Sequence, residues 1–172
     1  MCSIEECEYL VREVMSSQPH PGSSDFTSKK LLSSNNMQVR ISCRPCDSSG
    51  VEGKARGMTM NDPLEIILCT NRMKKSDVKE VLRHEAVHCF DYHHNRCDFS
   101  TCEGLAYTEV RAAREAECNR YFPAQIFKNW CVEYHAKKAT SNIFPRTGSQ
   151  CVDTVFKQAN TDSCGITDVE PF

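Results

Sequence analysis

Apolar residues recur at helical spacing near the start of the chain. Between residues 4 and 15 they return every three or four positions, with charged side chains on the opposite side; the apolar positions are Ile4, Cys7, Leu10, Val11 and Val14. Residues 18–28 are rich in Pro, Gly and Ser, which predicts a loop before a short helical or irregular piece at 29–32. The chain is therefore predicted to open with an amphipathic helix.

The periodicity then becomes that of strands. Residues 37–42 alternate apolar and polar side chains, as a half-buried strand does. Residues 64–69 form a short apolar run with adjacent isoleucines, so we expect a second strand there and a third between 51 and 58. Together these segments predict a small sheet.

A helix is expected after residue 76. Ser76 is a suitable N-cap, and Asp77 and Glu80 place negative charge in the first turn, where the helix dipole favours it. The apolar positions of this helix are expected to anchor it in the core; they are Val78, Val81, Leu82, Val87 and Phe90.

Helical patterns fill the rest of the chain. Residues 105–118 contain alanines and charges without Gly or Pro, and further helices are expected at 123–138 and 148–159. A small sheet followed by helices in 172 residues predicts an α+β fold in one domain, residues 1–172.

Charge and hydropathy narrow the function classes. The chain has 21 basic and 23 acidic residues, a net charge of -2 and no long run of either sign, so nucleic acid is not an expected partner. No stretch of 18 apolar residues is present, and the first residues resemble neither a secretory signal nor a transit peptide. We therefore expect a protein that is soluble or peripheral to a membrane.

Cysteine is unusually frequent. Twelve cysteines permit complete pairing, and disulfides are the favoured interpretation, with reduced buried thiols as the alternative. Cys43-x-x-Cys46 is half of a zinc-ribbon spacing, but no second such pair accompanies it. Cys89 is expected to be a core thiol.

The candidate chemistry lies in His84-Glu85-Ala86-Val87-His88. On a helix, two histidines four residues apart lie on one face and can share a metal ion. The glutamate between them is expected to act as general base on the attacking water and later as proton donor to the leaving amine. This spacing predicts a catalytic zinc site, one zinc per chain, with Glu85 as catalytic residue. A surface histidine pair and a purely structural zinc site are the alternatives.

A catalytic zinc takes three protein ligands, so one more is needed. Glu109 is the first choice, because it lies 21 residues beyond His88 on a separate predicted helix. Asp91, on the same helical stripe as the histidines, is the alternative third ligand, followed by His93 or His94. If Glu109 is the ligand, Asp91 is expected to orient a ligating histidine through the free ring nitrogen of that histidine. We also expect a peptide substrate to add along the strand at 64–69.

The motif belongs to a longer set of segments: His84 to Asp91, Cys97-Asp98-Phe99, Thr108-Glu109-Val110-Arg111-Ala112, Cys118, Cys43-Arg44-Pro45-Cys46, Ile67-Leu68-Cys69-Thr70-Asn71 and Cys131-Val132. Together they resemble the signature of the mitochondrial inner-membrane metallopeptidase family that processes an ATP synthase subunit. The chain departs from the family pattern at Gly104 and Tyr107, where a His and a Cys are usual.

The resemblance implies a zincin-like fold, with a small sheet packed against the HExxH helix and further C-terminal helices. It also implies a zinc endopeptidase of the mitochondrial intermembrane space, peripheral to the inner membrane, that processes the precursor of an ATP synthase proton-channel subunit and aids its assembly. Asp91, Arg111 and Tyr107 are then expected behind the zinc ligands or beside the substrate.

Two other function classes fit the same residues. In one, the protein is a non-catalytic, disulfide-stapled assembly factor that grips a membrane-protein segment, and zinc is structural. In the other, it is a disulfide-stapled binding module without metal. Metal content and the effect of replacing Glu85 separate the three classes.

Overall fold

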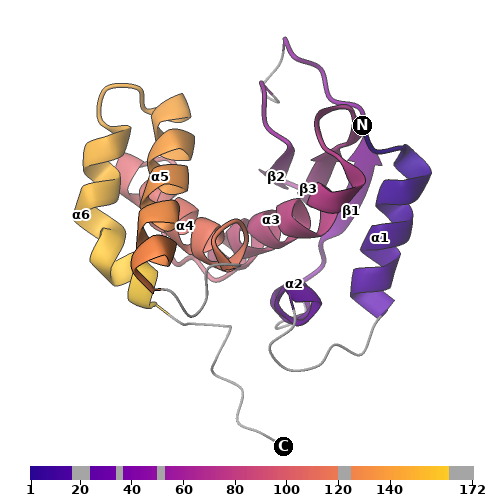
Figure 1. Cartoon of the computed structure of the whole chain (residues 1–172), viewed down its shortest axis with the longest axis horizontal. Helices are drawn as coiled ribbons and strands as arrows, with labels where there is room; N and C mark the ends of the chain where they lie inside the picture. Colours follow the sequence, from indigo (N-terminus) through magenta and orange to yellow (C-terminus); the bar gives the residue numbers. More distant parts are fainter. Residues whose placement is uncertain (17–23, 34–36, 50–52, 120–124, 163–172) are drawn as a thin grey trace, which may run out of the picture. The chain divides into compact units, whose positions relative to one another are not determined.

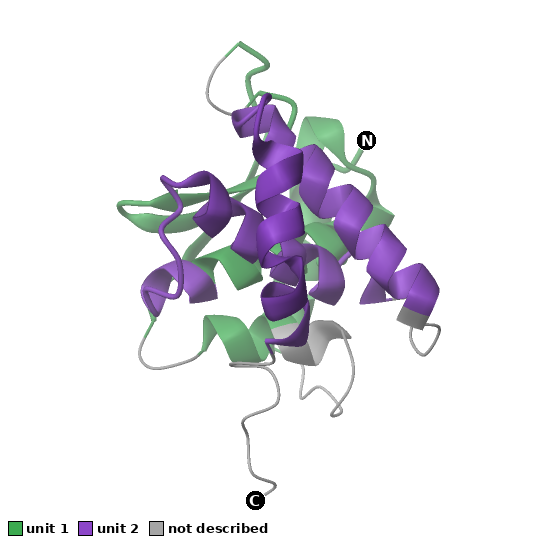
Figure 2. Ribbon diagram, turned by 90° about the vertical axis from the view of Figure 1, so that its left-hand side faces the viewer, with its two compact units in different colours: residues 1–89 green, residues 90–172 purple. Residues whose placement is uncertain are grey.

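The structure is a computed structural model that describes residues 1–16, 24–33, 37–49, 53–119 and 125–162. The chain divides into two compact units, Met1–Cys89 and Phe90–Phe172 (Figure 2). The expectation of a single domain stays a prediction. None of the described helices is both long and apolar enough to span a bilayer.

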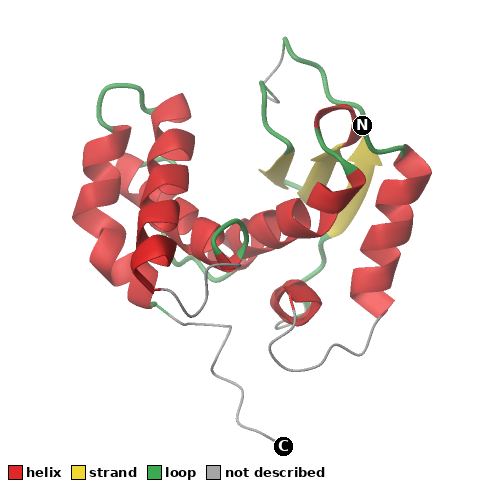
Figure 3. Cartoon of the chain, viewed as in Figure 1, coloured by secondary structure: helices red, strands yellow, loops and turns green. Residues whose placement is uncertain are grey.

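The first unit contains a three-stranded sheet with helices beside it (Figures 1 and 3). Its elements, in chain order, are α1 (Ile4–Ser16), α2 (Ser24–Leu32), β1 (Arg40–Arg44), β2 (Gly57–Asn61), β3 (Leu64–Cys69), the 3-10 helices η1 (Thr70–Arg72) and η2 (Lys75–Asp77), and most of α3 (Val78–His93). Strand β3 lies in the centre, parallel to β1 and antiparallel to β2. The apolar run at 64–69 is therefore a strand with the predicted bounds, whereas the strand predicted at 37–42 begins only at Arg40 and continues to Arg44.

Sheet order corrects one expectation. Both edges of β3 are hydrogen bonded, one to β1 and the other to β2, so a peptide cannot add along residues 64–69 as we expected. The third strand is also later than predicted, at 57–61 rather than within 51–58. A connection of only two residues, Asp62 and Pro63, fixes this register and pairs Asn61 with Leu64.

The start of α3 differs from the predicted cap. The Asp77 carboxylate accepts from the backbone N–H of Lys74 at 2.9 Å, and the Ser76 hydroxyl donates to the same carboxylate at 3.0 Å. Ser76 therefore lies within η2, and α3 begins at Val78. The apolar positions predicted for this helix are confirmed as buried, among them Val78, Leu82 and Val87.

The second unit is helical. It holds the end of α3 and packs α4 (Cys102–Glu115), α5 (Gln125–Ile143) and α6 (Gly148–Thr161) around a shared apolar core (Figure 1). Helix α4 begins three residues earlier than predicted, because the Thr101 hydroxyl caps it by accepting from the N–H of Gly104 at 3.1 Å. Helix α6 is confirmed, and α5 continues to residue 143 instead of ending near 138. The described residues are thus α+β, as predicted.

Disulfides stabilise both units, which confirms the favoured interpretation of the cysteines. The pairs in the described residues are Cys7–Cys43, Cys46–Cys69, Cys102–Cys151 and Cys118–Cys131. Because Cys43 and Cys46 each bond a different cysteine, they do not form half of a zinc ribbon. Cys2, Cys89 and Cys97 are free thiols, and Cys164 lies outside the described residues.

Candidate functional site

Helix α3 presents the two histidines of the motif side by side. The ring centroids of His84 and His88 are 4.8 Å apart with the rings nearly perpendicular, and a nitrogen of each lies within 4.8 Å of the other. His88 is only 8% exposed, so the pair is not a surface feature of an ordinary amphipathic helix. The neighbouring Leu82 and Val87 are fully buried and hold this part of α3 in place. Two neutral imidazoles in this arrangement can ligate one divalent ion.

Glu85, between the histidines, is held by strand β2. The Thr59 hydroxyl donates to Oε2 of Glu85 at 2.9 Å and lies 3.3 Å from the backbone oxygen of the same residue. Glu85 is 5% exposed, and burial of a carboxylate is stable only when donors satisfy it. The base predicted from the sequence thus has a hydroxyl donor from another element.

Strand β2 passes very close to α3 at this point. A Cβ on Gly57 would lie 2.6 Å from Cγ1 of Val81 and 3.1 Å from Oε1 of Glu85. Any larger residue would therefore push the strand from the helix. The sequence analysis missed both Gly57 and Thr59. The local signal for them is the glycine inside a strand, because such a glycine often marks a position where another part of the chain approaches closely.

Cys89 is a core thiol, as predicted. It is fully buried and donates weakly to the Thr59 hydroxyl, at 3.8 Å from Sγ to Oγ1. Burial raises the pKa of this thiol to about 12, partly offset by the Thr59 hydrogen bond. The thiol stays protonated at neutral pH, so Cys89 is neither a nucleophile nor a thiolate ligand.

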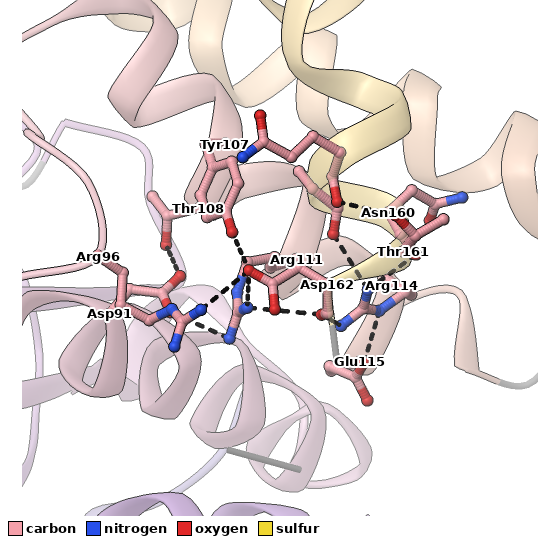
Figure 4. A network of polar contacts seen from close by, with 12 residues as sticks. Asp91, Arg96, Tyr107, Thr108, Arg111, Arg114, Glu115, Asn160, Thr161 and Asp162 are labelled. Carbon is pink, nitrogen blue, oxygen red and sulfur yellow. Dashed lines mark hydrogen bonds and ion pairs between the residues drawn. The ribbon is translucent and has the colours of Figure 1, made fainter. Parts of the chain in front are cut away.

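Asp91 lies one turn after His88, in the second unit, and is held by helix α4 (Figure 4). Thr108 donates to its Oδ2 at 2.9 Å, and Nη2 of Arg111 lies 3.1 Å from its Oδ1. The side chains of Asp91 and Arg111 are fully buried. Burial raises the pKa of Asp91 to about 6, although Arg111 and Thr108 pull it down. At neutral pH the carboxylate is therefore ionised and paired.

The polar network continues from Arg111 to the end of α6. Asp162 pairs through its carboxylate with Arg111 at 3.1 Å and with Arg96 at 3.0 Å, and it accepts from the hydroxyl of Tyr107 (Figure 4). The guanidinium of Arg114 donates to the backbone oxygen of Asp162 at 2.7 Å. Arg111 and Tyr107, expected near the ligands or the substrate, thus bind Asp162, and Arg111 also binds Asp91. Arg96 and Asp162 were not anticipated.

Glu109, the predicted third ligand, lies on α4 between Thr108 and Arg111 in the sequence. Its side chain is half-buried, and its Oε2 atom is shielded from solvent.

The other candidate ligands, His93 and His94, lie at the end of α3. Their ring centroids are 5.0 Å apart, and the ring centroid of His94 is also 4.3 Å from that of Phe90. Burial lowers the pKa of His94, which keeps that ring neutral near pH 7.

A second group of metal-ligand types lies in the helical unit. Ligand atoms of Cys118, Cys131 and His135 are within 4.8 Å of one another. The two sulfurs are joined in a disulfide, however, and a disulfide sulfur does not supply the thiolate that zinc requires. This group is therefore a covalent staple beside a histidine.

Comparison with known proteins covers nearly the whole chain. The sequence profile of the Peptidase M76 family matches residues 5–172. The mitochondrial inner membrane protease ATP23 homolog of Xenopus laevis is 34% identical over 145 residues, 77% of this chain and 57% of that protein. The mitochondrial inner membrane protease atp23 of Schizosaccharomyces pombe is 28% identical over 149 residues, 81% of this chain and 75% of that protein. No solved structure matches.

Proposed function

The chain belongs to the Peptidase M76 family, and from that premise we propose that it is a zinc-dependent endopeptidase of the HExxH type. The observation that carries the proposal is the pair of adjacent imidazoles, His84 and His88, on either side of a buried glutamate that a hydroxyl of β2 holds. Membership of a peptidase family favours hydrolysis over a structural role for the metal.

The donor set fits zinc. His84 and His88 supply nitrogen ligands, and we propose Glu109 as the oxygen ligand, a combination that zinc accepts in catalytic sites. Asp91 is the weaker candidate, because a charged guanidinium and a hydroxyl already bind its two oxygens. When bound, the ion would polarise the scissile carbonyl and make water acidic enough to react at neutral pH.

Glu85 performs the proton transfers in this proposal. Its ionised carboxylate takes a proton from the attacking water and then gives it to the leaving amine of the cleaved peptide. The hydrogen bond from Thr59 satisfies one oxygen of this buried carboxylate.

Asp91, Arg111 and Tyr107 support the site without joining the reaction. Asp91 binds Thr108 and Arg111, the neighbours of Glu109 on α4, and so restrains the turn of helix that carries the proposed ligand. Tyr107 restrains the same helix through Asp162. A peptide substrate would extend the sheet at an outer strand, and β2 is the outer strand that contacts α3 beside Glu85.

The names of the relatives support a proposal about the location of the reaction. Both are mitochondrial inner membrane proteases by name, and the chain spans only 57% of the Xenopus protein. We propose that this protein works in the intermembrane space at the surface of the inner membrane, on the precursor of an ATP synthase proton-channel subunit whose assembly it aids. Four disulfides within the described residues fit an oxidising compartment.

The substitution Glu85→Gln tests the mechanism. It should abolish cleavage of a quenched fluorescent peptide spanning the presequence junction of that subunit, while one zinc per chain remains in elemental analysis. Glu80→Gln is the matched control, because Glu80 lies on the same helix and pairs at the surface with Arg56. Undiminished cleavage by the Glu85→Gln variant would refute the mechanism. If instead the Glu85→Gln variant no longer cleaved but restored growth to cells lacking the protein, the assembly-factor function with structural zinc would replace the peptidase function.

A further inference from the structure

Two residues of β2 face the motif helix, and both contact or crowd Glu85. Gly57 and Thr59 are two apart in the strand and therefore lie on the same face of the sheet. Gly57 leaves only enough space for the Glu85 side chain, and Thr59 donates a hydrogen bond to it. Strand β2 thus limits the space for the Glu85 side chain at Gly57 and donates a hydrogen bond to its carboxylate at Thr59.

We propose that Thr59 is a positioning residue that sets the orientation of the Glu85 carboxylate for proton transfer. The inference rests on the proposed function, because it assigns a partner to the base of that same reaction. Thr59 itself does not contact the reacting atoms; it acts through Glu85.

The geometry restricts Thr59 as well as Glu85. A β-branched side chain has few rotamers, and the Thr59 hydroxyl also accepts from the thiol of Cys89 at 3.8 Å. The antiparallel pairing of Thr59 with Ile66 fixes the backbone of this residue, and the contact with Cys89 restrains its hydroxyl. A glutamate side chain has several rotatable bonds, and a donor at 2.9 Å from a fixed strand selects among its orientations.

A purely structural role predicts a different outcome from a positioning role. If the hydroxyl only satisfied a buried carboxylate, its removal would lower stability and leave turnover of the folded enzyme unchanged. If it orients the base, its removal lowers kcat, because proton transfer depends on the geometry of the donor and acceptor. Substrate affinity would be nearly unaffected, so KM would stay constant.

Thr59→Val removes the hydroxyl and keeps the shape of the side chain, whereas Thr59→Ser keeps the hydroxyl. We expect kcat of the zinc-loaded full chain on the fluorescent peptide to fall by about 10–100-fold in Thr59→Val. This range is typical of residues that hydrogen-bond to the side chains of a metal site and orient them. KM should change by less than about twofold, and Thr59→Ser should recover most of kcat. Zinc affinity, measured by competition with a chromophoric chelator, should be unchanged in both variants.

Ser42→Ala is the matched control. It removes another hydroxyl-to-carboxylate hydrogen bond of the same sheet, between Ser42 and Glu65, away from the motif helix. Its kcat should equal that of the unmodified chain. Thr59→Ala is measured in parallel, so that a valine variant that fails to fold still leaves a hydroxyl-free enzyme to compare with Thr59→Ser.

Each outcome has a defined meaning. If hydroxyl-free variants keep kcat while Glu85→Gln is inactive, the role of Thr59 is overturned and the peptidase function stands. A loss of kcat that Thr59→Ser does not recover, or that follows loss of zinc, also overturns it. If Glu85→Gln cleaves normally, the proposed function itself has failed, whatever the Thr59 variants do.

Discussion

The buried ion pair between Asp91 and Arg111 should dominate the stability of the helical unit. In Arg111→Met, the Oδ1 atom of Asp91 loses the guanidinium 3.1 Å away, while the Thr108 hydroxyl still donates to Oδ2 of this carboxylate. Both side chains are fully buried, and breaking such a pair typically costs about 3–5 kcal/mol. Because burial already raises the pKa of Asp91 to about 6, the orphaned carboxyl can take up a proton, so we expect a loss near the lower end, about 3 kcal/mol.

The assay is urea denaturation of the oxidised protein at pH 7, followed by circular dichroism and extrapolated linearly to water. Lys137→Met is the control, because Lys137 pairs with Glu133 and Asp153 in partly exposed positions, and surface pairs contribute at most about 1 kcal/mol. The double variant Asp91→Asn with Arg111→Met removes the orphaned charge. It should be more stable than the sum of the single losses predicts, by about 1–3 kcal/mol.

Additive losses, within about 0.5 kcal/mol, would refute the reasoning, because they would mean that the two groups do not interact. A loss in Arg111→Met no larger than in Lys137→Met would refute it equally, since burial would then carry no penalty.

Three further predictions follow from the described contacts. The pKa of Asp91 is raised from 3.8 to about 6, so between these values the folded chain binds this proton more tightly than the unfolded chain; the stability of the unmodified chain relative to Asp91→Asn should therefore fall as the pH rises from about 4 to 6, and a constant difference would contradict this. Gly57→Ala should lower the free energy of unfolding by about 1–3 kcal/mol, because its Cβ would lie 2.6 Å from Cγ1 of Val81; unchanged urea stability would show that the strand moves freely. Replacing Cys7 and Cys43 together by alanine opens a loop with a sequence separation of 36 and should cost about 3–4 kcal/mol in thermal or urea unfolding, whereas an equal stability of the oxidised forms would rule out that disulfide.

The motif helix and the proximity of its two histidines could be predicted from the sequence because they depend on near neighbours. Spacing by 3.6 residues places His84 and His88 on one face and the apolar anchors on another, whatever the rest of the chain does. The same local reasoning was sufficient for α1, α6 and the strand at 64–69. Local reasoning failed at Ser76. This residue is not the N-cap of α3, because the Asp77 carboxylate accepts from the backbone N–H of Lys74 and Ser76 lies within η2.

Only the tertiary structure determined the contacts between residues that are distant in the sequence. Local pattern contains no information on the partner of each cysteine, on the order of strands in the sheet or on the donor to a buried carboxylate. Those depend on loop closure and on which surfaces meet, so the central place of β3, the pairing of Cys43 with Cys7 and the hold of Arg111 on Asp91 emerge only in three dimensions. The sequence by itself predicted Glu85 as the base of a metal site, and the folded chain added Thr59, which lies 26 residues away and donates to the Glu85 carboxylate.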